Sequence, residues 1–438
     1  MVMQSGLARI RNFVFRNGAA MYPHMQNDVG GISLGRANLT MSNCLFDSVH
    51  YGVIGYASIS EHSVRLDSCD FVNSSCRCVQ ASTILAEACS FHSDTIDWAQ
   101  LTFSSNSVIN NCSFSGDFHG GNVLLGSGWN IRLSNCTFSD FDVAPAYAMI
   151  SLGIGWSEIV DNLFINFPNV SAVLGVFTRC EYGPNIISRN RFENIVVPPE
   201  YYSDHGATCM SVYVEEDSIE CDTTLVYDNI FLDCRVGTGG SGMNINGRSL
   251  VTHNRFVRVS GGNSSSAATI GESDYVFRDN IFLDNSFALD LSGFFYTVNA
   301  EWNYWGHESG PYHPLLNPMG QGDAVADSVD FNPWHQDTLF WTSVENERPV
   351  VSSMWHLLTL YPTPFNNDFC MEIAGFTRDD FIVKLYNLLG REVAVLHQGS
   401  LSGGTIHFTA PPTLSSGVYF VRASDRIQTE TIKVVLLK

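Results

Sequence analysis

The chain carries little positive charge and is nearly free of lysine. Its 438 residues include 23 lysine and arginine residues against 44 aspartate and glutamate residues, a formal net charge of −21. No lysine occurs before Lys384. A surface of this sign repels phosphate backbones and anionic lipid headgroups, so the composition excludes nucleic acid and anionic membranes as main partners.

Long apolar runs are absent as well. No stretch reaches the roughly 18 apolar residues that a membrane-spanning helix requires, and the longest apolar segment, 143–156, is interrupted by Pro145. The first six residues lack the charged stretch and apolar core of a signal peptide. We therefore expect no transmembrane segment, and we expect an N-terminally truncated product in which a coil-like phrase begins at Ile10.

Paired metal-binding cysteine motifs are missing. Twelve cysteines are present, but Cys76 and Cys78 have no second CxxC or histidine pair with which to complete a zinc site. The cysteine spacing indicates no particular redox compartment. One disulfide is left open among the cysteines that flank the longest repeat interval: Cys180, Cys209, Cys221 and Cys234.

The sequence does contain an internal repeat of a short phrase. In the typical copy an aliphatic residue is followed, after two or three residues, by Asn or Cys, then by any residue and then by an aromatic residue; the copy that ends at Phe15 is degenerate. Successive copies are 20 to 39 residues apart, and most intervals lie in the twenties. The copies end at Phe15, Phe46, Phe71, Phe91, Phe114, Phe138, Phe164, Phe192, Phe231, Phe256, Phe282 and Trp305.

This period predicts an all-β fold, a right-handed parallel β-helix of about 11–12 coils. Leucine-rich repeats have a similar length, but their several leucines per repeat are absent, and helical repeats need about 33 residues or more. Stacked coils place equivalent positions roughly 4.8 Å apart, which predicts an inward phenylalanine ladder. A second inward ladder is expected at Ile109, Leu133, Ile159, Ile187, Val226 and Val251.

The bend between two strands of each coil is expected to hold Asn or Cys. An asparagine side chain can satisfy backbone groups that a turn leaves unpaired and can bond to the next coil. Cysteine is a small buried filler, so we expect a ladder of free thiols at Cys44, Cys69, Cys89, Cys112 and Cys136. Outward residues of mixed charge predict a surface ladder rather than a catalytic row: Asp161, Arg189, Asp228, His253 and Asp279.

Residues 303–334 are rich in aromatic residues, glycine and proline, which predicts a cap over the end of the coils. This segment also resembles the terminal segment of many secreted bacterial right-handed β-helix proteins. Asp323, Asp327 and Asp330 are weak calcium candidates, because their spacing lacks the alternate-position pattern of a calcium loop. Turn formation is their favoured role. The β-helix domain is expected to span residues 1–334.

A second module is expected after a linker at residues 335–355. From Trp355 onward acidic and basic residues balance, so the whole charge of −21 belongs to the upstream part. Strand-like segments alternate with glycine and proline turns over residues 356–438, which predicts a small β-sandwich.

This C-terminal module resembles the type A C-terminal sorting domain of the type IX secretion system of Bacteroidetes. The resemblance implies export across the outer membrane by the type IX machinery, followed by release or attachment to the cell surface. Thr363 stands where the family usually has Asn. The matching residues include Tyr361, Pro362, Pro364, Phe365, Asn366, Gly390, Arg391, Glu392, Gly417, Tyr419, Lys433 and Lys438.

Pectin lyase-like β-helix proteins include lyases and hydrolases, but the usual hydrolase phrases are not present here as a set. The best candidate site is the 39-residue interval between Phe192 and Phe231, because insertions of this kind form loops that line grooves. Calcium is a candidate cofactor there. The catalytic candidates are Glu215, Glu216, His205 and Tyr202, and the binding candidates are Tyr201, Tyr202 and Asp217.

Two functions therefore remain. In the favoured one, the chain is a secreted or outer-membrane surface β-helix that binds or scaffolds carbohydrate or other extracellular partners. In the alternative, it is a polysaccharide lyase or glycoside hydrolase that acts on a cell-wall or uronate polysaccharide. A uronate polymer needs calcium or an arginine cluster to approach so acidic a protein.

Overall fold

A computed structural model of the protein divides the chain into two compact units, Met1–Ser343 and Val344–Lys438. The structure describes residues 2–17, 31–49, 51–55, 62–73, 77–92, 99–116, 122–128, 130–141, 148–153, 155, 157–170, 172–179, 185–198, 208–215, 223–262, 264–271, 275–291, 297–342, 358–361, 368–387, 391–409, 414–424 and 429–436.

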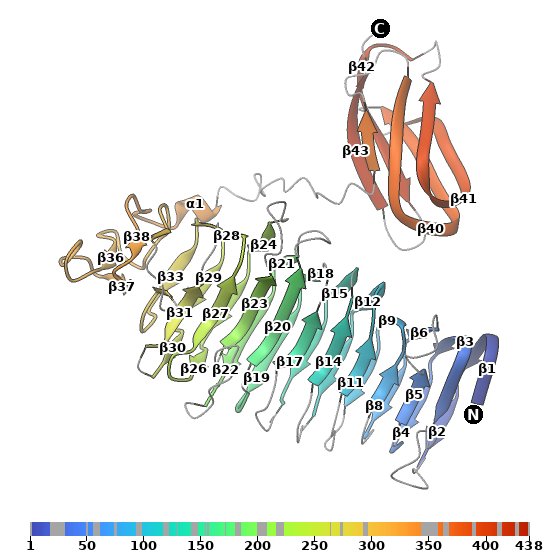
Figure 1. The fold of residues 1–438 in the computed structure, drawn as a ribbon, viewed down its shortest axis with the longest axis horizontal. Coiled ribbons are helices and arrows are strands. Elements are labelled where there is room, and N and C mark those ends of the chain that lie inside the picture. The colour runs from blue at the N-terminus through green and yellow to red at the C-terminus, as the bar shows by residue number, and fades with distance from the viewer. Residues whose placement is uncertain are drawn as a thin grey trace. The chain divides into compact units, whose positions relative to one another are not determined.

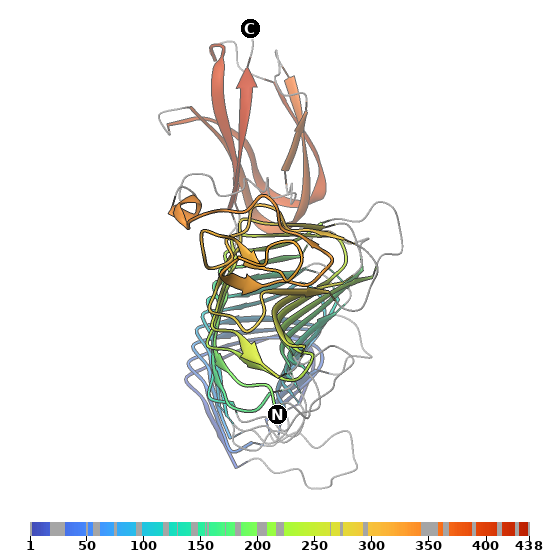
Figure 2. The ribbon, with the colours of Figure 1, turned by 90° about the vertical axis from the view of Figure 1, so that its left-hand side faces the viewer.

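The first unit is a parallel β-helix with three faces (Figure 1), which confirms the predicted parallel β-helix. Strands of one face lie behind one another in successive coils (Figure 2). The long strands β1 (Val2–Arg11) and β3 (Ile32–Ser42) join the first and second faces. The first face continues through β5 (Tyr51–Gly55), β8 (Arg77–Gln80), β11 (Ala99–Phe103), β14 (Asn122–Ser127), β17 (Ala148–Gly153), β20 (Ala172–Arg179), β23 (Thr208–Glu215), β27 (Ser241–Asn246), β31 (Ser266–Ile270) and β34 (Leu289–Leu291).

The second and third faces are built in the same way. The second face contains β6 (Ser63–Asp67), β9 (Thr83–Glu87), β12 (Ser107–Asn110), β15 (Ile131–Ser134), β18 (Ser157–Val160), β21 (Ile186–Ser188), β24 (Thr224–Tyr227), β28 (Ser249–Thr252) and β32 (Tyr275–Arg278). The third face contains β2 (Val14–Arg16), β4 (Leu45–Asp47), β7 (Asp70–Val72), β10 (Ser90–His92), β13 (Ser113–Ser115), β16 (Thr137–Ser139), β19 (Leu163–Phe167), β22 (Arg191–Ile195), β25 (Ile230–Leu232), β29 (Arg255–Val257) and β33 (Ile281–Leu283). Two short strands, β26 (Arg235–Val236) and β30 (Ser260–Gly261), pair beside them.

The predicted phenylalanine ladder fills the inside of the third face. From Phe15 to Trp305, neighbouring rings are stacked with centroids 4.5–5.0 Å apart and interplanar angles of 3–15°. The spacing follows from the separation of hydrogen-bonded strands, so the rings pack face to face in offset stacks. The rings from Phe46 onward are buried.

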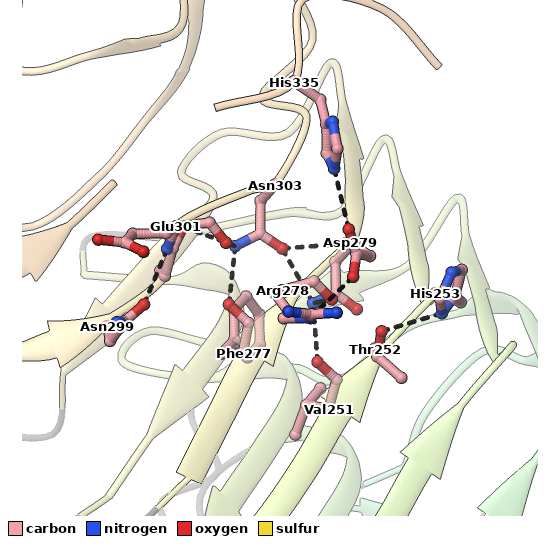
Figure 3. A network of polar contacts seen from close by, with 12 residues as sticks. Val251, Thr252, His253, Phe277, Arg278, Asp279, Asn299, Glu301, Asn303 and His335 are labelled. Atoms are coloured by element: carbon pink, nitrogen blue, oxygen red, sulfur yellow. Dashed lines mark hydrogen bonds and ion pairs between the residues drawn. The ribbon is translucent and has the colours of Figure 1, made fainter. Parts of the chain in front are cut away.

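An asparagine ladder occupies the bend after the second face. Both the backbone N–H and the Nδ2 of Asn254 donate to Oδ1 of Asn280, at 2.9 and 3.0 Å, and Nδ2 also donates to the carbonyl of Val226. The same pattern links Asn280 to Asn303, the last rung. Nδ2 of Asn303 donates to the carbonyl of Phe277 (Figure 3). Every rung is buried, and the ladder comprises Asn162, Asn190, Asn229, Asn254, Asn280 and Asn303.

Free thiols fill the same position in the earlier coils, as expected. At the junction, the backbone N–H of Cys136 donates to Oδ1 of Asn162 at 2.9 Å, and its thiol donates to the carbonyl of Ser134. Contact with the Cys112 thiol, together with burial, raises the pKa of Cys89 to about 12. Five cysteines of this ladder are therefore buried free thiols that act as packing groups: Cys44, Cys69, Cys89, Cys112 and Cys136.

Left-handed residues flank each strand of the third face. The residue before each bend Asn has φ between 55° and 59° from Asp161 to Asp279. A second row follows the strand, with φ of 53–63° at Asp140, Asn166, Asn194, Asp233 and Arg258. Few non-glycine residues adopt this conformation, so the sharp bends are held by the coil stacking around them.

A cap of short elements follows the last coil. It contains β35 (Val298–Asn299), β36 (Pro311–Tyr312), β37 (Gly322–Ala324), β38 (Val329–Asp330) and the short helix α1 (Leu339–Thr342). Trp305 is the last ring of the aromatic ladder, and Asn303 is the last rung of the asparagine ladder. The cap thus continues both ladders before it covers the end of the core.

The second unit is a five-stranded antiparallel sheet made of β39 (Leu358–Tyr361), β40 (Asp368–Asn387), β41 (Glu392–Thr409), β42 (Gly417–Ser424) and β43 (Thr429–Leu436). Register shifts interrupt the pairing of β40 with β41. β39 pairs with the first part of β40 and β42 with its last part, and β39 also contacts β43. The sheet therefore folds over a small core, in keeping with the predicted sandwich.

Replacing Asn254 by alanine is expected to destabilise the β-helix by about 3 kcal/mol, because several buried donors and acceptors lose their partners. Chemical unfolding followed by circular dichroism measures this change. The control is Asn299→Ala, since Asn299 is exposed and its side chain accepts one bond, from the N–H of Glu301. An equal loss of unfolding free energy in the two variants would show that the asparagine ladder does not contribute more to stability than an exposed asparagine does.

Thiol labelling tests the cysteine ladder. Eight of the twelve cysteines are buried free thiols, so a maleimide should add at most four labels to the folded protein at pH 7.5 and twelve after reduction and denaturation. Intact-mass spectrometry counts the labels. Rapid labelling of more than four thiols in the folded state would contradict the buried ladder.

Candidate functional site

Most residues of the predicted loop site lie outside the described residues. These are Tyr201, Tyr202, His205, Glu216 and Asp217. Glu215 is the last residue of β23, where the strand register pairs it with Arg179 of β20. The predicted loop candidates therefore adjoin both ends of β23 along the chain.

Strand β23 belongs to a face whose inward and outward positions differ sharply. Leu174, Met210 and Met243 are paired across β20, β23 and β27 and lie in the core. Because side chains alternate along a strand, the next residues point outward. We call the following outward group the aromatic face: Gly175 and Phe177 of β20, Ser211 and Tyr213 of β23, and Asn244 and Asn246 of β27.

Two aromatic rings lie side by side on this face. Phe177 and Tyr213 occupy paired positions on adjacent coils, and their ring centroids are 6.3 Å apart at 42°. Tyr213 is 45% exposed. On one side Phe177 is paired with Gly153, and on the other Tyr213 is paired with Asn246. The ring pair is therefore flanked by a glycine, Gly153, on the preceding coil and by the side-chain amide of Asn246 on the next coil.

Sequence reasoning missed this pair. Both rings stand at alternate positions from buried aliphatic residues in strand-like runs, Val176 before Phe177 and Val212 before Tyr213. That alternation was the available signal, but the register that brings the two runs together is set by coils of 39 and 28 residues. Only the structure supplies it.

The outward charged row forms ion pairs between coils, as a surface ladder should. Arg189 binds Asp161 with two bonds of 2.6 and 2.7 Å. Further along the row, His253 lies near Asp228 and Asp279, yet burial lowers the pKa of His253. A neutral imidazole is therefore favoured at pH 7.

Asp279, the last member of the row, contacts residues at the C-terminal end of the first unit. Asp279 is hydrogen-bonded to His335 Nε2 at 2.9 Å and forms an ion pair with Arg278 Nε at 3.0 Å (Figure 3). The His335 ring also stacks on Phe340, with centroids 3.9 Å apart. Residues 335–342 of the expected linker thus belong to the first unit. The cluster uses both oxygens of Asp279 in protein contacts, which is a structural use of the carboxylate.

Asp323, one of the calcium candidates, stands where a further asparagine rung would lie. Its Oδ2 accepts bonds from the backbone N–H and the Nδ2 of Asn285, at 3.0 and 2.6 Å, and Asn285 itself bonds to the preceding coil through Phe256 and Val259. Burial raises the pKa of Asp323 to about 6. The carboxylate terminates a second, shorter ladder.

The other two calcium candidates have separate partners. Asp327 Oδ1 lies 3.3 Å from Nε2 of the buried His313, and Asp330 accepts a long bond from the N–H of Asn332. Within the ranges that the structure describes, no three histidine, cysteine, aspartate or glutamate side chains are grouped to hold a metal ion. Calcium binding stays a prediction.

The disulfide that the sequence left open does not involve Cys209 or Cys234. Cys209 and Cys234 are buried free thiols, and contact between them and burial raise the pKa of Cys209. Cys180 and Cys221 lie outside the described residues.

Several of the predicted sorting residues lie close to the start of β41 or in β42. The N–H of Asn387 donates to the carbonyl of Arg391, and the N–H of Arg391 donates to Oδ1 of Asn387. Glu392 accepts a bond of 2.9 Å from Lys384. The buried Tyr419 of β42 donates to the carbonyl of Ser415. Tyr361, Gly417 and Lys433 lie in strands, whereas Pro362, Pro364, Phe365, Asn366, Gly390 and Lys438 lie outside the described residues.

The fold defines a parallel β-helix protein with a separate antiparallel β module at its C-terminus. Residues 359–437 match the family of secretion system C-terminal sorting domains, which confirms the resemblance seen in the sequence. No curated protein matches the chain. The C-terminal module is thus a type IX sorting domain, and the protein is exported to the cell surface or the medium. No helix in the described part of the chain is long and apolar enough to cross a membrane.

The raised pKa of Asp323 predicts a pH-dependent stability. Because the folded state holds this proton more tightly than the unfolded chain does, the stabilisation is complete below about pH 4 and is lost as the pH rises through about 6. Asp323→Asn keeps an acceptor for Asn285 without the buried charge. We expect the variant to be more stable than the parent at pH 8, by on the order of 1–3 kcal/mol, and equal to it at pH 4.

Thermal unfolding at pH 4, 6 and 8 measures this difference. Asp330→Asn is the control, since Asp330 is exposed and outside the ladder. A variant less stable than the parent at pH 8 would mean that the charge itself holds the cap in place.

Proposed function

We propose that the β-helix binds a carbohydrate on the aromatic face and that the sorting domain delivers this binding module to the cell exterior. The observation that carries the proposal is the ring pair of Phe177 and Tyr213 on adjacent coils, in which Tyr213 is exposed and Phe177 is half-buried. Aromatic rings offer apolar surface to the C–H faces of sugar rings, and tyrosine adds a hydroxyl for orientation.

Polar groups beside the rings support this reading. Asn244 and Asn246 are half-buried at neighbouring outward positions, and an amide can both donate to and accept from a sugar hydroxyl. An extended polysaccharide that runs along the stack would meet the same backbone repeat at every coil. The arrangement suits a polymer better than a small ligand, which would need a closed pocket.

The charge of the module narrows the class of carbohydrate. All of the net charge of −21 lies upstream of Trp355, so a neutral polysaccharide meets no repulsion, whereas a polyuronate does. We therefore favour a neutral glycan. Carbohydrate binding without reaction also agrees with the structural use of Asp279 and Asp323, whose oxygens are committed to protein partners.

Affinity electrophoresis of the full chain in gels that contain a neutral glucan, xylan or mannan, or polygalacturonate, tests the proposal. At least one neutral polymer should retard the protein, and Tyr213→Ala should weaken that retardation about tenfold, because one stacking ring is lost. Phe177→Ala should act in the same direction.

Tyr312→Ala is the matched control, because Tyr312 is also 45% exposed but lies in the cap. The proposal fails if no neutral polymer retards the protein or if the three variants behave alike. Reducing ends or unsaturated uronates released during incubation would instead favour the lyase or hydrolase alternative.

A further inference from the structure

A loop of the cap presents three apolar side chains to solvent. We call residues 313–320 the cap loop; it lies between β36 and β37, at the end of the first unit opposite the N-terminus (Figure 1). Leu315, Leu316 and Met319 are 81%, 67% and 81% exposed. The cap loop joins strands that complete the fold, yet these three side chains contribute nothing to the core.

The cap loop is held in place by its polar residues. The His313 ring is buried, and its Nδ1 accepts bonds from the N–H groups of Leu315 and Leu316, at 3.2 and 3.0 Å. Since Nδ1 is an acceptor, the proton is on Nε2, which faces Asp327. Asn317 exchanges backbone bonds with His313.

Two further contacts fix the base of the cap loop. Asn317 Nδ2 donates to the carbonyls of Ser309 and Pro311, at 2.9 and 2.8 Å. A Cβ on the buried Gly320 would lie 2.1 Å from the Pro311 carbonyl, so the backbone approaches too closely for another residue. The apolar side chains are therefore displayed by a preorganised scaffold, which lowers the entropic cost of binding.

The formally charged residues of the cap segment 301–342 are all acidic. Residues 301–342 contain no lysine or arginine and six acidic residues. Asp327 is 84% exposed at the root of the cap loop, and Glu308 and Asp337 are also exposed. An acidic rim around apolar side chains favours a partner with the opposite rim.

We infer that the cap loop docks a protein partner that presents an apolar pocket edged by basic side chains. Leu315, Leu316 and Met319 would enter the pocket, and the acidic rim would steer the approach and set its salt dependence. An anionic membrane is disfavoured because the six acidic residues repel it. Two caps of the same chain are disfavoured for the same reason. The inference is independent of carbohydrate binding, since it concerns a different face.

Fluorescence anisotropy with two labelled amphipathic peptides tests the inference. The two share one leucine pattern and carry lysine or glutamate at the remaining positions. The full chain should bind the Leu/Lys peptide at least tenfold more tightly than the Leu/Glu peptide, and the preference should shrink between 50 and 500 mM salt. Replacing Leu315, Leu316 and Met319 together by serine should weaken binding of the Leu/Lys peptide at least tenfold.

Leu7→Ser is the matched control, because Leu7 is 65% exposed on β1 and should leave peptide binding unchanged. The triple variant should unfold at the parent temperature, since the three side chains are outside the core. Equal binding of the two peptides, or equal effects of the triple variant and Leu7→Ser, overturns the inference. So does loop-dependent binding to phosphatidylcholine–phosphatidylglycerol vesicles, or self-association that the triple variant abolishes.

Discussion

The hydrogen bonds between successive coils are the constraint on which the first unit depends. Each coil lies one strand separation above the last, so any position repeated along the sequence becomes a column in space. The asparagine ladder shows this clearly, because each asparagine side chain occupies the bend of its own coil and is hydrogen-bonded to the asparagine of a neighbouring coil. The sharp left-handed residues beside it are tolerated only because these bonds hold them there.

Cysteine and asparagine occupy the same bend of the coil but stabilise it by different contacts. In the coils up to Cys136 a small buried thiol fills the bend, and the stacked phenylalanine rings pack beside it in the core. From Asn162 onward the bend is held by hydrogen bonds. The cap ends this second regime by supplying Asn303 to one ladder and Asp323 to another. The cap thus supplies hydrogen-bonding partners to the last residues of both ladders. One of these partners, the carboxylate of Asp323, is a largely buried acidic group.

The two units differ in net charge and in the side chains that they expose. The sorting domain is neutral and addresses the protein to the exterior through a fold shared with other exported proteins. The β-helix carries nearly all of the net negative charge and has two distinct surfaces, the aromatic face on its side and the cap loop at its end. Partners of different chemistry suit them, because one combines rings with amides and the other combines aliphatic side chains with carboxylates.

The β-helix, its ladders and the cap could be predicted from residue types repeated at a regular spacing, and the sorting domain from its motif residues. Features that depend on strand register became visible only in the folded chain. The pairing of Phe177 with Tyr213 crosses coils of unequal length, and the left-handed bends at residues such as Arg189 have no signature in composition. Asp323 was visible as an acid near other acids, but its role as a ladder terminus required Asn285 of an earlier coil. Local spacing specifies what stacks, whereas only the folded chain specifies which outward side chains become neighbours.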